Sequence, residues 1–146
     1  MISARELFIR HNLRCTRQRL ALYEALRMCK SHPTAEELFQ LAMPSLGSSP
    51  KGGMSRATVY NTLEALVGAG LTRRMPAANG CCRYDADTSE HLHVRLRNTG
   101  EICDVPHELG ERLIDTLPRA LLSEIERQMN IRIDGVSIQF TATSRA

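Results

Sequence analysis

The chain has 146 residues, enough for one or two small domains, with 19 Lys and Arg against 16 Asp and Glu. Residues 1–80 hold eleven basic against five acidic residues, a net +6, whereas residues 81–146 hold eight against eleven, a net −3. A basic first half favours a nucleic-acid partner, and the acidic second half favours a different task. No apolar run could span a membrane and no signal-peptide pattern occurs, so we expect a cytoplasmic protein without a membrane partner.

The five cysteines form no recognisable metal or disulfide pattern. Their number is odd and no C-x-x-C pair occurs, so neither a disulfide framework nor a thiolate zinc site is indicated. Cys81 and Cys82 suggest a thiol switch, but adjacent cysteines rarely reach good disulfide geometry. We therefore expect five reduced thiols.

The first 54 residues predict three short helices and a loop. Ser3 and Thr34 each begin a capping box, and Thr16 precedes a run of apolar residues spaced three apart. We expect the first helix to end near Asn12. Two prolines, three glycines and three serines in residues 44–54 predict a loop.

A fourth helix, over residues 56–69, precedes a two-stranded hairpin. Ser55 is its N-cap, and Gly70 marks its end. Two short extended stretches follow, over residues 71–75 and 82–85, and Asn79-Gly80 between them is a strong hairpin-turn pattern. Three helices and such a wing form a winged helix-turn-helix, whose recognition helix would be residues 56–69 and whose first helix is an extension.

The second half predicts a small α+β domain. Strands are expected over residues 91–96 and 101–105, a helix over 107–130 with an interruption at Pro118, and a closing strand over 131–143. So few strands cannot bury a sheet alone, which favours a homodimer. The chain is therefore expected to be α+β, with a winged-helix DNA-binding domain at 1–85 and a dimerisation domain at 86–146.

A His-x-His pattern after a carboxylate indicates a candidate metal site. His91 and His93 would share one face of a strand, Asp85 precedes them, and Asp104 lies on the next expected strand. Neutral imidazole and carboxylate are usual ligands of divalent Fe, Mn and Zn. Each residue also has a plain structural alternative: a polar strand end for the His-x-His and Asp85, a turn for Asp104, and a loop for His32.

Taken together, these features resemble the ferric-uptake-regulator family from about Leu7 to Phe140. The most specific stretches begin at Thr16 (TRQRL), His32 (HPTAEEL), Ser55 (SRATVYNTL) and His91 (HLH). The chain is most similar to the peroxide-stress branch, whose regulatory metal site has two Asp and three His. The resemblance implies that these ligands are His32, Asp85, His91, His93 and Asp104. Iron-sensing relatives have Glu in place of Asp85 and commonly Arg in place of Asn61.

The departures from the family concern other metal sites. Most relatives hold a structural zinc with two C-x-x-C pairs; the first would fall on Leu96 and Thr99, and the C-terminus has no cysteine for the second. We therefore expect no structural zinc. Leu92 stands where iron regulators place an aspartate ligand of a secondary site, which is accordingly also expected to be lost.

The resemblance also implies a mechanism. A metal held by ligands from both halves would fix the spacing of two recognition helices in a dimer. In the peroxide-sensing relatives Fe(II) at this site leads to oxidation of a ligand histidine, loss of the metal and release of DNA; His32 and His91 are the corresponding candidates here. The expected cofactor is Fe(II) or Mn(II), one ion per subunit.

The DNA contacts are expected at the start of the fourth helix. Asn61 can bond adenine through two hydrogen bonds, and Tyr60 can pack on a thymine methyl. Arg56 and Thr58 are expected to contact phosphates, and the resemblance places Arg14 in the minor groove. For any arginine the alternative is a solvated surface charge.

Several functions fit the residues. The first is a metal-dependent repressor that binds double-stranded operator DNA and senses peroxide through Fe(II). The second is a sensor of iron or manganese availability without oxidation chemistry. An Fe-dependent oxidase and a metal-independent winged-helix binder are two further options. The basic first half with its acidic second half, and the exposed polar face of the recognition helix, argue against an enzyme. Neither feature is needed to bind a small-molecule substrate.

Overall fold

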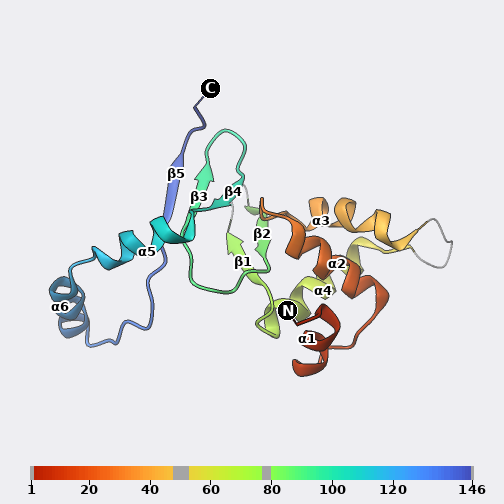
Figure 1. Ribbon diagram of the computed structural model, residues 1–146, viewed down its shortest axis with the longest axis horizontal. Coiled ribbons are helices and arrows are strands. Elements are labelled where there is room, and N and C mark those ends of the chain that lie inside the picture. The colour runs from red at the N-terminus through yellow and green to blue at the C-terminus, as the bar shows by residue number, and fades with distance from the viewer. Residues whose placement is uncertain (1, 48–52, 77–79, 146) are drawn as a thin grey trace. The chain divides into compact units, whose positions relative to one another are not determined.

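A computed structural model describes residues 2–47, 53–76 and 80–145 (Figure 1). The chain is α+β and divides into two compact units, Met1–Ser89 and Glu90–Ala146. Among the helices that the structure describes, none has the length and apolar character needed to cross a membrane.

The helices of the first unit begin where the sequence predicts. Ser3, Thr16, Thr34 and Ser55 each accept a hydrogen bond from a backbone N–H of the first turn, and the first and third complete capping boxes. These N-caps satisfy donors that a helix start otherwise leaves unbonded. The helices are α1 (Ala4–Arg10), α2 (Arg17–Met28), α3 (Ala35–Ala42) and α4 (Arg56–Gly68).

The predicted loop before α4 is partly helical. Its first residues extend α3 into the 3-10 helix η1 (Met43–Leu46), because Leu46 is buried in the core. Residues 48–52 lie outside the described part of the chain.

The wing follows α4. Gly70 adopts a positive φ of 73°, and the Leu71 N–H donates to the Leu66 carbonyl, which ends the helix. Strands β1 (Arg73–Pro76) and β2 (Cys82–Asp85) pair antiparallel, as expected for a wing. The predicted turn at Asn79-Gly80 extends into residues 77–79, which the structure does not describe.

Helices α2 to α4 with the wing form a winged helix-turn-helix, and α1 is an extension of it. One apolar cluster joins α2, α3, α4 and Tyr84 of β2. A second cluster packs Phe8 of α1 against Tyr23, Leu66 and Leu71. The two clusters fix α4 from both sides and leave its remaining face exposed.

The second unit contains a three-stranded sheet and two helices. β3 (His93–Leu96) lies between β4 (Ile102–Asp104), its antiparallel neighbour, and β5 (Gln139–Ala142), its parallel neighbour. Helices α5 (His107–Asp115) and α6 (Arg119–Met129) are separated at Pro118, as predicted.

All three strand predictions in this unit were too long, and the one over 101–105 is reduced to β4. Residues 91–92 precede β3, because β4 is short and pairs only with residues 93–95. The predicted strand over 131–143 is reduced to β5, since only that stretch lies alongside β3. Residues 131–138 are not assigned to a strand.

Candidate metal centre and nucleic-acid interface

His32 and Asp85 form a buried pair within the first unit. His32 lies in the turn between α2 and α3, and Asp85 is the last residue of β2. The imidazole Nδ1 lies 3.6 Å from a carboxylate oxygen of Asp85, and both residues are buried. The same oxygen accepts a hydrogen bond of 2.8 Å from the Asp87 N–H, which fixes the orientation of the carboxylate. The first unit thus holds one imidazole and one carboxylate at contact distance.

Three further donors converge within the second unit. His93 and Asp104 are opposite one another across β3 and β4. The Nε2 atoms of His91 and His93 lie 3.0 and 3.4 Å from the same Asp104 oxygen, and 2.9 Å from each other. His91 reaches this point although it precedes the strand. These three donor atoms lie within 4.8 Å of one another.

The two donor sets fit a divalent cation of the borderline class. Imidazole nitrogen and carboxylate oxygen are the ligands that Fe(II), Mn(II) and Zn(II) accept. Two facing Nε2 atoms at 2.9 Å can share at most one proton if they bond each other, whereas a cation can bind the lone pairs of both. All five residues implied by the family resemblance therefore fall in one or the other set.

The remaining histidines and the nearby cysteine lie elsewhere. His107 is exposed on α5 and pairs with Glu111 at 3.2 Å, and His11 is the exposed C-cap of α1. Cys103 is exposed and lies opposite Val94, so it alternates away from Asp104 in the strand. Leu92 is buried.

The outer face of α4 carries the two expected base-reading residues. Val59, Leu63 and Leu66 are buried, and Tyr60 and Asn61 lie on the opposite, exposed side of the helix. Tyr60 is 55% exposed, so its ring is accessible from solvent.

The phosphate-binding candidates are arranged around the start of α4. Arg56 forms a bidentate ion pair with Glu36 of α3, with N–O distances of 2.9 Å, and its guanidinium lies over the Phe39 ring. Hydrogen bonding to Arg56 lowers the pKa of the Glu36 carboxyl. Thr58 donates its backbone N–H to the Ser55 cap. A phosphate that binds Arg56 must therefore compete with Glu36.

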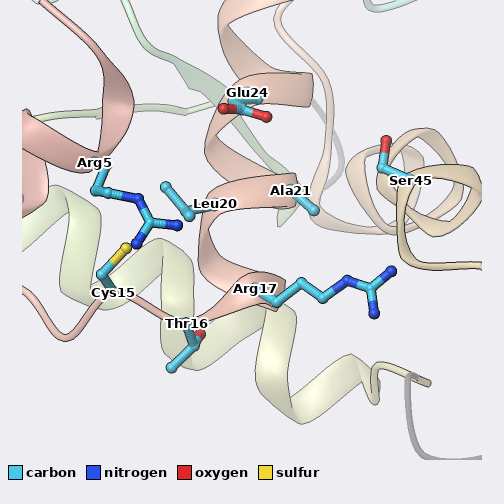
Figure 2. Close-up of a pocket in the computed structure, with 8 residues that line it drawn as sticks. All are labelled: Arg5, Cys15, Thr16, Arg17, Leu20, Ala21, Glu24 and Ser45. Carbon is cyan, nitrogen blue, oxygen red and sulfur yellow. The ribbon is translucent and has the colours of Figure 1, made fainter.

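A cleft beside the start of α2 is lined by Arg17, which the sequence places on the basic face with Arg19, Arg73 and Arg74, and by Arg5, which sequence reasoning did not single out. Figure 2 shows Arg5 from α1 and Arg17 from α2 on opposite sides of this cleft, with Cys15 near Arg5. Glu24 also lines it, so the cleft is not uniformly cationic. Arg14 is exposed in the turn just before α2. Its backbone carbonyl accepts a hydrogen bond from the Arg19 guanidinium.

Comparison with known proteins places the chain in a family. The model of the ferric uptake regulator family matches residues 10–138. The peroxide-responsive repressor PerR of Staphylococcus saprophyticus is 33% identical over 97 residues, 66% of this chain and 62% of that protein. The peroxide operon regulator of Bacillus subtilis is 36% identical over 92 residues, 63% of this chain and 60% of that protein. The chain thus spans less than two thirds of either relative.

The fold agrees with this match. The ferric uptake regulator of Vibrio cholerae superposes with a TM-score of 0.68 over 94% of this chain and 96% of that chain, at 23% identity. The sequence is similar to peroxide-responsive repressors, and the family model covers most of its length. The chain therefore belongs to the ferric uptake regulator family.

Proposed function

We propose that this chain is a metal-dependent, DNA-binding transcriptional repressor that senses peroxide through the histidines that hold Fe(II). The observation that carries the proposal is the convergence of His91, His93 and Asp104 in one unit, together with the buried His32–Asp85 pair in the winged-helix unit. Each unit thus contributes an incomplete donor set of the same chemistry. Together they make a five-donor site for one ion, Fe(II) or Mn(II).

A shared ion couples metal binding to DNA binding. Asp85 and Asp104 neutralise the two charges of the cation, and the three imidazoles complete the set. An ion that binds donors from both units favours the arrangement in which the units are held together. If that arrangement is also the one that fits the operator, linkage requires metal and DNA to strengthen each other's binding.

The sensing step uses the ligand histidines as reductants. Fe(II) held by these residues would supply the redox chemistry that cleaves the oxygen–oxygen bond of hydrogen peroxide. In the net reaction His32 or His91 gives up two electrons and gains one oxygen on a ring carbon, and the other peroxide oxygen leaves as water. A ring modified in this way would no longer complete the donor set, so the remaining residues would hold the ion less tightly and the repressor would leave the DNA.

DNA binding is assigned to the first unit. Tyr60 and Asn61 read base edges from the exposed face of α4, Arg56 and Thr58 contact phosphates at its start, and Arg14 reaches the minor groove. The net +6 charge of residues 1–80 supports an anionic partner.

The second unit is proposed to form a homodimer without structural zinc. In the single chain its helices, its last strand and the segment just after α6 expose large apolar side chains, which a second copy can bury. No C-x-x-C pair is present to hold a zinc ion. The exposed apolar residues are Leu109, Leu113, Leu121, Ile125, Met129, Ile131 and Phe140.

A sensor of iron or manganese availability is the second candidate. The same donor sets can bind either metal reversibly without any oxidation, and the superposition with a ferric uptake regulator favours it as much as the first. The two candidates share every residue named above and differ only in their response to peroxide.

The shared claim is tested by measuring metal-activated DNA binding. Anaerobic fluorescence anisotropy with an operator selected from random duplexes should show tighter binding when Mn(II) is added. His93→Ala should abolish this activation and leave the fold intact. His107→Ala is the matched control, since His107 is an exposed histidine of the same unit. Activation retained in His93→Ala, or lost equally in both variants, would contradict the proposed site.

A further inference from the structure

His32 has an unusual backbone for a side chain proposed to bind a metal. Its φ is +48°, a left-handed conformation that non-glycine residues rarely adopt. Among the described residues, the other non-glycine examples are Asn12 and Asn130. Such a conformation persists only where the surroundings impose it.

Arg83 supplies that constraint. It is 8% exposed, and its Nη1 donates both to the His32 carbonyl at 3.0 Å and to the Glu37 carboxylate at 3.1 Å. The same Glu37 oxygen accepts the Thr34 N–H at 3.0 Å as part of the capping box. One buried cation therefore links the His32 backbone to the start of α3.

The neighbouring backbone is fixed in the same way. The Tyr84 N–H donates to the Pro33 carbonyl at 3.0 Å. The backbones of Thr34 and Arg83 also form an isolated antiparallel β-bridge. In β2, Arg83 and Asp85 are two residues apart and so lie on one face of the strand. Arg83 holds the His32 carbonyl, and Asp85 contacts its imidazole at 3.6 Å.

We infer that Arg83, with Glu37 as its counter-ion, is a positioning residue that presets His32 for metal binding. The inference rests on the proposed function, because His32 is a ligand only if that metal site exists. Groups that orient metal ligands typically change affinity by about 10- to 100-fold when removed. Arg83 donates to the His32 carbonyl, so it acts through the backbone of His32.

Two substitutions separate this role from general stability. Arg83→Met removes both hydrogen bonds and keeps an unbranched stem. Glu37→Gln keeps an acceptor for the Thr34 N–H, because glutamine also completes a capping box, but removes the charge that holds Arg83. Glu6→Gln is the matched control, since Glu6 completes the same motif in α1, where Ser3 is its partner.

The first measurement needs no metal. In metal-free protein with ¹³C-labelled histidine, the His32 ring resonance, assigned with His32→Ala, should broaden or split in Arg83→Met. The resonances of His11 and His107 should stay unchanged, as should all lines in Glu6→Gln. An unaltered His32 resonance in a folded Arg83→Met protein overturns the inference, whatever the metal does. If Arg83→Met does not fold, Glu37→Gln takes its place, with a smaller change in the same direction.

The second measurement is Mn(II) affinity by calorimetry. Arg83→Met should weaken Mn(II) binding by about tenfold. In a His32→Ala background the same substitution should change affinity by less than about twofold, because the ligand through which it acts is gone. Equal losses in both backgrounds would show a merely structural role. If wild-type protein binds no Mn(II) or Fe(II), the proposed function fails, and the resonance of His32 still decides the positioning role.

Discussion

Asn61→Ala should separate operator recognition from stability. Asn61 is exposed on α4, on the side of the helix opposite the buried Leu63 and Leu66. Because no core contact is lost and alanine is the better helix former, the free energy of unfolding should change by less than about 0.5 kcal/mol. A side chain that bonds adenine through two hydrogen bonds contributes about 1–3 kcal/mol of discrimination. Operator affinity should therefore fall by about 5- to 150-fold.

The assay is anisotropy with Mn(II)-loaded protein on two duplexes, the selected operator and a random sequence of equal length. Binding to the random duplex should be nearly unchanged, because it depends on phosphate contacts. Gln128→Ala, which truncates an exposed amide on α6, is the control and should leave both affinities unchanged. Equal losses on both duplexes, or no loss on the operator, would refute base reading by Asn61.

Three further outcomes are expected. Purified protein should stay a folded dimer in sedimentation after chelation and hold no zinc by elemental analysis; monomers or unfolded chain would contradict this. Phe8→Ala should lower the free energy of unfolding by about 3–5 kcal/mol in urea titrations, because the ring is fully buried beside Tyr23; a loss below about 1 kcal/mol would show that α1 packs loosely. Glu36→Gln should tighten binding to operator and random DNA alike, because it frees Arg56 for phosphate; unchanged affinity on both would remove Arg56 from the interface.

The features predictable from the sequence were those encoded locally. Each α-helix start in the first unit depends on a cap within three residues of it, so Ser3, Thr16, Thr34 and Ser55 could be identified without any knowledge of packing. The break at Pro118 has the same local origin, since proline cannot continue the hydrogen bonding of a helix.

The features that were missed depend on distant partners. The extent of β5 is set by pairing with β3, more than 40 residues earlier in the chain, and apolar alternation alone cannot supply that limit. The bond between Arg83 and His32 joins residues 51 positions apart. One sequence clue was available: Arg83 precedes Asp85 by two residues in an expected strand, which places both on one face.

The metal ligands are an intermediate case. Family resemblance named all five, and the structure brings His91, His93 and Asp104 together in one unit and His32 and Asp85 in the other. That one ion binds both sets stays a prediction. The residues alone could not establish it, because histidine and aspartate at such spacings also occur at ordinary turns and strand ends.

The central claim is tested most directly by one anaerobic experiment. Protein loaded with Fe(II) or with Mn(II) is bound to operator DNA, treated briefly with hydrogen peroxide, and analysed for both DNA release and sites of added oxygen by mass spectrometry. The account predicts that only the Fe(II) form releases DNA and that the added oxygen lies on His32 or His91. Unmodified histidines with DNA still bound would make the protein a sensor of metal availability. Oxygen on Cys81 or Cys82 with complete release of DNA would assign the response to thiols. Either result contradicts the account.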